Sequence, residues 1–82
     1  MDCELINLLY EAEEMGIYDE DVTELEMYIN GRLLTSVTME NNATDIPEYV
    51  FWTRSDDGVT EKETDLSDEE KITILKEVIA WY

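Results

Sequence analysis

The pair Asn30-Gly31 most constrains how this chain can fold. It separates two runs of apolar and β-branched residues, 24–29 and 32–39. Asn-Gly in that setting is the strongest short-range signal for a β-hairpin, because both residues tolerate the left-handed backbone that a tight turn requires. The sequence therefore predicts two antiparallel strands joined at this pair.

The register of this hairpin depends on the length of its loop. A two-residue turn pairs Ile29 with Arg32, whereas a three-residue loop with a left-handed Gly31 pairs Met27 with Leu33. Register follows the hydrophobic pattern, so we prefer the three-residue loop. It gathers on one face the apolar residues Leu25, Met27, Leu33, Val37 and Met39. The other face then shows Glu24, Glu26 and Tyr28.

The first half of the hairpin also has a helical interpretation. Val22, Leu25 and Ile29 lie near helical spacing, and Thr23 with Glu26 forms a potential capping box. Short apolar runs are ambiguous by period alone, so strand and helix both stay open for residues 25–29.

Helices are predicted at both ends of the chain. A buried stripe that includes Leu5, Leu8 and Ala12 predicts a helix over residues 3–15, capped by Asp2 and ended by a left-handed Gly16. The second helix follows the sequence Ser67-Asp68-Glu69-Glu70, a complete capping box, and runs to the end of the chain. Its apolar surface is wider than one-sided packing requires, which is explained either by a helix wedged between the sheet and the first helix or by self-association or partner contact through Ile74, Val78 and Trp81.

Two further strands are predicted between the hairpin and the second helix. Residues 48–54 alternate large apolar side chains on both faces, which is typical of a central strand. The turn signal Asp57-Gly58 leads into residues 59–64, whose charged side chains are typical of an edge strand. We therefore expect one α+β domain over residues 1–82, with the order α-β-β-β-β-α and a small antiparallel sheet of three to four strands.

Charge is the abnormal quantity of this sequence. Its 82 residues contain 22 Asp and Glu against five Lys and Arg, for a net charge of −17. Ten of the acids fall in residues 1–31, which contain no Lys or Arg. Such repulsion disfavours a compact fold and excludes direct binding to nucleic acid or an anionic membrane. The expected partner has a basic surface, and the chain itself is expected to be a monomer or homodimer.

The residue types disfavour catalysis and metal binding. The chain has no His and a single cysteine, Cys3, so the usual acid, base and nucleophile combinations cannot be assembled. The alternation of Asp19, Asp21 and Thr23 suggests a calcium loop, but Glu24 and Asn30 stand where an EF-hand needs Gly and Glu. We expect no enzyme activity, no cofactor and no metal. Without an apolar leader, the chain is expected in the cytoplasm.

The acidic display is the remaining functional feature. Alternate residues on a strand lie ~6.7 Å apart, and every second phosphate of one DNA strand, at ~3.4 Å per phosphate, lies ~6.8 Å further along the axis. Carboxylates at that pitch can occupy a groove that normally holds a phosphate backbone. The expected partner-binding residues are Glu11, Glu14, Asp19, Glu20, Asp21, Glu24, Glu26, Tyr28, Asp56 and Asp57.

In size, acidity and the mixture of a short sheet with flanking helices, the chain resembles the small acidic inhibitors encoded by phages and plasmids, of the anti-CRISPR and anti-restriction type, many of which mimic DNA. The resemblance is compositional and covers the whole chain. It implies a nuclease such as a Cas effector, or a restriction or repair enzyme, as the target, inside a bacterial host cell. The alternatives are an antitoxin-like or regulatory module that binds one basic partner without mimicking DNA, and adaptation of an ordinary protein to high salt.

Overall fold

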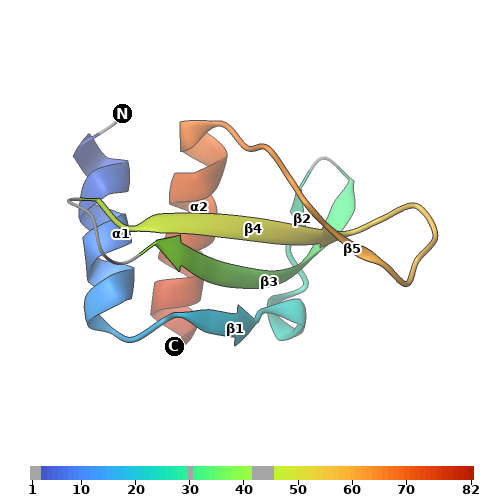
Figure 1. Cartoon of the computed structure of the whole chain (residues 1–82), viewed down its shortest axis with the longest axis horizontal. Coiled ribbons are helices and arrows are strands. Elements are labelled where there is room, and N and C mark those ends of the chain that lie inside the picture. The colour runs from blue at the N-terminus through green and yellow to red at the C-terminus, as the bar shows by residue number, and fades with distance from the viewer. Residues whose placement is uncertain (1–2, 30, 42–45) are drawn as a thin grey trace.

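The computed structural model of the chain describes residues 3–29, 31–41 and 46–82. Two helices, α1 (Cys3–Glu14) and α2 (Asp68–Trp81), pack beside each other against one face of an antiparallel sheet (Figure 1). The sheet has the strand order β1-β3-β4-β5, and a short β2 pairs with the start of β3. The strands are β1 (Asp19–Asp21), β2 (Tyr28–Ile29), β3 (Arg32–Asn41), β4 (Glu48–Arg54) and β5 (Glu61–Glu63). The predicted α+β class is confirmed.

Helix α1 follows the predicted pattern and ends where the glycine permits. Gly16 has a φ of +80°, and its N–H donates to the carbonyl of Glu13 at 3.0 Å while Ile17 N–H donates to the carbonyl of Ala12 at 3.1 Å. This pair of bonds is the Schellman motif, which satisfies carbonyls that have no helical partner. Met15 lies beyond the helix and is 36% exposed, so it does not extend the buried stripe. The predicted cap Asp2 lies outside the described residues.

The N-terminus of α2 carries the predicted capping box. Glu70 N–H donates to Ser67 Oγ, and Ser67 N–H donates to Glu70 Oε1, both at 3.2 Å. The helix buries Ile74, Leu75 and Val78 completely against the sheet and α1. The prediction of self-association through Ile74, Val78 and Trp81 is therefore wrong for its first two members, because the wide apolar surface of α2 meets two layers at once.

The central pair β3 and β4 forms the core of the sheet. Val37 pairs with Phe51 and Met39 with Tyr49, and these side chains face the helices. The Tyr49 hydroxyl donates to the carbonyl of Ile17, in the connection between α1 and β1. Strand β4 has the predicted bounds, and β5, though shorter than predicted, is an exposed edge strand as expected.

The hairpin adopts the register that the sequence analysis did not prefer. Ile29 pairs with Arg32, and Leu34 N–H donates to the carbonyl of Met27 at 2.8 Å. A bulge in β3 between Leu34 and Ser36 explains the difference. Because of this bulge, Leu34 is fully buried while Leu33 is half-buried. The predicted register assumed strict alternation along the strand and therefore assigned Leu33, instead of Leu34, to the core face.

Candidate partner-binding surface

Most of the negative charge lies on the surface without neutralisation. The described residues include 20 of the 22 acids, of which 17 are exposed and three are half-buried. Within this described part, two ion pairs form: Arg32 with Asp56 at 3.0 Å and Lys76 with Glu4 at 3.3 Å. The surface therefore presents a strong negative field to any partner.

One continuous segment of the chain contains only acids among its charged residues. The chain from α1 to β2 carries nine described acids and no Lys or Arg. Its later part runs from the second half of α1 through β1 to the 3₁₀ helix η1 (Thr23–Leu25), along the lower side of Figure 1. We call this side the acidic edge, defined by Glu11, Glu14, Asp19, Asp21, Glu24 and Glu26, all of them exposed. Six of the predicted partner-binding residues are therefore exposed on this one segment.

The three consecutive acids 19–21 precede the first predicted strand, at 24–29, and form a strand of their own, β1. Asp19 pairs with Thr38 and Asp21 with Ser36, on the face of the sheet that no helix covers. Glu20 points to the other face, where it is half-buried. Three consecutive acids are tolerated here because β1 is an edge strand with solvent beside it. Asp19 and Asp21 therefore repeat at the strand pitch of ~6.7 Å.

Glu24 and Glu26 are exposed but do not form the predicted strand ladder. Thr23 donates its N–H and its hydroxyl to Asp21 Oδ1, at 3.0 and 2.8 Å, which turns the chain into η1. These two hydrogen bonds also lower the pKa of Asp21. Glu26 then has a left-handed φ of +51°. Residues 25–29 are thus the end of a 3₁₀ helix followed by a two-residue strand, so each earlier interpretation was partly right.

A second row of carboxylates lies at the opposite edge of the same face. Glu63 pairs with Trp52, and Glu61 pairs with Arg54. Across the sheet, the partner of Trp52 is Ser36, whose own partner is Asp21. With strands ~4.8 Å apart, Asp21 and Glu63 stand on backbones about 14 Å apart. We call this helix-free side the open face.

The centre of the open face is neutral. It consists of Ser36, Thr38, Val50 and Trp52, and the indole Nε1 of Trp52 donates to Thr38 Oγ1 at 2.8 Å. The open face thus carries two acidic rows, Asp19 with Asp21 and Glu61 with Glu63, on either side of a neutral strip. Glu61 and Glu63 were not among the predicted partner-binding residues, because only strand pairing places them on the same face as β1.

Asp56 and Asp57 are not part of either row. They lie in the loop between β4 and β5, at the right end of Figure 1. Asp56 is held by Arg32, and Asp57 accepts hydrogen bonds from Ser55, Val59 and Thr60 within its own loop. Those bonds hold the pKa of Asp57 far below its usual value, chiefly through Thr60. Asp57 therefore shapes the loop in addition to carrying charge.

Exposed aromatic side chains accompany the acids. Tyr28, which was predicted to contact the partner, is 66% exposed, and Tyr18 beside β1 is 49% exposed. At the end of α2, Trp81 and Tyr82 are 48% and 52% exposed. Tyr82 lies next to Glu20, whose charge raises the pKa of the Tyr82 hydroxyl. Tyr and Trp are enriched among the residues that dominate binding energies at protein interfaces.

In the described part of the chain, no helix has both the length and the apolar character of a membrane span. Nor does any group of three or more Cys, Asp or Glu within it have a geometry able to hold a metal ion. Compared with known proteins, the chain matches no protein-family model, no curated protein and no solved structure.

Proposed function

We propose that this chain is an acidic inhibitor that occupies the basic nucleic-acid-binding groove of a nuclease or another DNA-binding protein. On this proposal its carboxylates replace DNA phosphates, as in inhibitors of the anti-CRISPR and anti-restriction type. The observation that carries the proposal is the pair of acidic rows on the open face. The proposed site of action is the cytoplasm of a bacterial cell, where such nucleases act.

The spacing of the rows supports the proposal. Along each row, the two carboxylates repeat at ~6.7 Å, close to the ~6.8 Å of axis that separates every second phosphate of a DNA strand. Across the face, the separation of about 14 Å between Asp21 and Glu63 is comparable to the ~12 Å width of the major groove. A receptor shaped for two phosphate strands can therefore meet both rows at once.

The lack of internal neutralisation supports the proposal as well. Asp19, Glu61 and Glu63 have no ion pair within the described residues. Arg54 stands opposite Glu61 in register and contributes to the lowered pKa of Asp21, so it reduces the charge at one end of the face. The acids of the rows keep most of their charge for a partner. Their mutual repulsion is relieved when a basic surface binds them.

A second candidate function is that of an acidic interaction module that binds one basic partner without imitating DNA. The aromatic side chains beside the acidic edge favour it, since Tyr18, Tyr28 and Tyr82 add apolar contact area that a phosphate backbone does not offer. Such a partner would bind the acidic edge and leave its own DNA site free.

A competition experiment separates the two functions. A fluorescein-labelled DNA duplex is bound to each of three purified proteins: a guide-loaded Cas nuclease, a restriction enzyme and a DNA-repair enzyme. The chain is then added at increasing concentration. Mimicry predicts that the chain displaces the duplex from at least one of them, with an apparent affinity that falls steeply between about 50 and 200 mM salt.

The variants locate the surface that acts. The double substitution D19K/E61K reverses one carboxylate in each row and should weaken displacement by about tenfold or more. The matched control E69K/E77K makes the same change in net charge at two exposed positions of α2 and should keep most of the inhibition. Equal losses in the two variants would show that only total charge matters. Binding that leaves the duplex in place would overturn mimicry in favour of the interaction module.

A further inference from the structure

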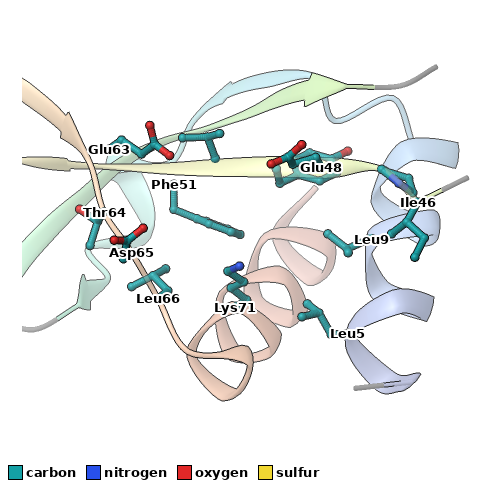
Figure 2. A pocket seen from close by; sticks show the side chains of 13 residues that line it. Leu5, Leu9, Ile46, Glu48, Phe51, Glu63, Thr64, Asp65, Leu66 and Lys71 are labelled. Atoms are coloured by element: carbon teal, nitrogen blue, oxygen red, sulfur yellow. The ribbon is translucent and has the colours of Figure 1, made fainter. Parts of the chain in front are cut away.

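The edge of the sheet opposite β1 borders a groove of about 360 Å³ (Figure 2). It runs beside the first half of β4, between this strand, α1, the start of α2 and the chain that connects β5 to α2. Its apolar wall includes Leu5 and Leu9 of α1, Phe51 of β4, and Leu66. No residue of this groove belongs to the acidic edge.

One side of β4 has no strand partner along this groove. Strand β5 pairs only with Trp52–Arg54, and the last contact beyond it is the N–H of Thr64 donating to the carbonyl of Phe51 at 3.0 Å. Peptide groups of an antiparallel strand alternate in direction, so Phe51 and Tyr49 direct theirs to the same side. In the described part of the chain, no strand pairs with Glu48–Val50 there. This edge is therefore a template for an added strand.

The charges around the groove define what fits it. Glu48, Glu63 and Asp65 are exposed carboxylates at its rim, and Lys71 is a half-buried cation at its floor (Figure 2). The rim is thus acidic above a largely apolar wall. A segment with basic side chains at its ends and an apolar side chain between them complements both features.

We propose that this groove binds an extended, basic segment of a partner protein as an additional strand beside β4. The free edge from Glu48 to Val50 spans about 10 Å, enough for about three residues of an extended peptide. Main-chain hydrogen bonds to β4 hold the segment, and alternate side chains pack on Leu9 and Phe51 below or meet the rim carboxylates above. The inference does not rest on the proposed function, because the open face and this groove are different surfaces that share only Val50 and Glu63.

A second copy of this chain is the less favourable occupant. Two copies of a protein with a net charge of −17 repel each other, and the groove presents acids to both. A basic segment instead gains attraction from the rim carboxylates. The charge therefore favours a partner of opposite sign over self-pairing through the β4 edge.

The probe that tests the proposal is a fluorescein-labelled octapeptide, Lys-Lys-Thr-Val-Thr-Val-Lys-Lys, measured by fluorescence anisotropy. Two matched peptides accompany it: one with glutamates in place of the lysines, and one with N-methyl groups on alternate central amides. Strand addition predicts that either change weakens binding by about tenfold or more, since one reverses the charge and the other removes main-chain donors. Equal binding of the N-methylated peptide would overturn strand addition, as would failure of the lysine peptide to bind.

Protein variants and amide exchange place the site. E48K/D65K should lose most of the affinity for the lysine peptide, whereas E69K/E77K, with the same change in net charge, should keep it; circular dichroism checks that both fold. The amide of Tyr49 should exchange more slowly when the peptide is bound. If the exchange rate of the Tyr49 amide did not change when the peptide bound, the peptide would not bind beside β4 and the proposed site would be wrong. If the protein were a dimer and this amide exchanged slowly without peptide, the β4 edge would pair with a second copy instead.

Discussion

The hydrogen bond between Tyr49 and Ile17 makes a testable contribution to stability that depends on pH. Tyr49 is 6% exposed, and its hydroxyl donates to the carbonyl of Ile17. The substitution Y49F removes the donor and leaves that carbonyl without this bond. At pH 8 the cost should be about 1 to 3 kcal/mol, the penalty for an unsatisfied buried acceptor.

The pH dependence follows from the pKa of the same hydroxyl. Burial, and then the charges of Glu13 and Tyr18, raise the pKa of Tyr49 from 10.0 to about 12. Because the unfolded chain loses this proton first, the stabilisation is complete below pH 10 and is lost as the pH rises toward 12. Between pH 8 and pH 11 the wild-type protein should lose about 1.4 kcal/mol from this group, and Y49F should lose none of it.

Urea unfolding followed by tryptophan fluorescence measures the difference. A change of about 1.4 kcal/mol corresponds to a shift of about 0.5 to 1.4 M in the unfolding midpoint. Other groups that titrate in this range, including Tyr82, are present in both proteins and cancel in the comparison. Y28F removes an exposed hydroxyl and should behave like the wild type. If Y49F lost as much stability as the wild type between pH 8 and pH 11, the assignment of the pH dependence to Tyr49 would be refuted.

Three further outcomes are expected. D57N should unfold at a lower urea concentration than the wild type at pH 7, because the Asp57 carboxylate accepts the hydrogen bonds of its loop. This difference in unfolding midpoint should narrow as the pH falls below 3.8, the ordinary pKa of an Asp side chain. A difference that stayed constant down to pH 2 would contradict the prediction. S67A should lower the free energy of unfolding by about 1 kcal/mol, because it removes the N-cap of α2, and it should reduce the helical circular dichroism signal on mild heating. S55A is the matched control and should leave that signal unchanged. Raising sodium chloride from 0.05 to 1 M should raise the melting temperature by screening repulsion among the acids, while a chain that unfolds in 0.05 M salt would support salt adaptation.

Local signals in the sequence predicted the ends of the elements well. Gly16 ends α1 because a left-handed residue is needed there, and Ser67 with Glu70 begins α2 because the two side chains satisfy each other's backbone donors. The alternation over residues 48–54 predicted β4 with its observed bounds. These features require only neighbours within a few residues, so the sequence contains all the information that they need.

The candidate surface was less accessible to such reasoning. The acids 19–21 have low strand propensity, and they form β1 only because β3 offers them a partner and solvent covers their open side. The two rows of the open face lie on strands about 40 residues apart in the chain. Their common face follows from the pairing of β1, β3, β4 and β5, which no local pattern encodes.

By itself, the sequence determined the excess of negative charge, the two helices with their caps, the central strand β4 and the position of the hairpin, since each depends on composition or on short-range hydrogen bonds and side-chain periodicity. Only the tertiary structure decided the hairpin register, the burial of Ile74 and Val78, and the alignment of Asp21 with Glu63. Those three depend on which distant segments pack together, and a single bulge in β3 is enough to exchange the residue that faces the core.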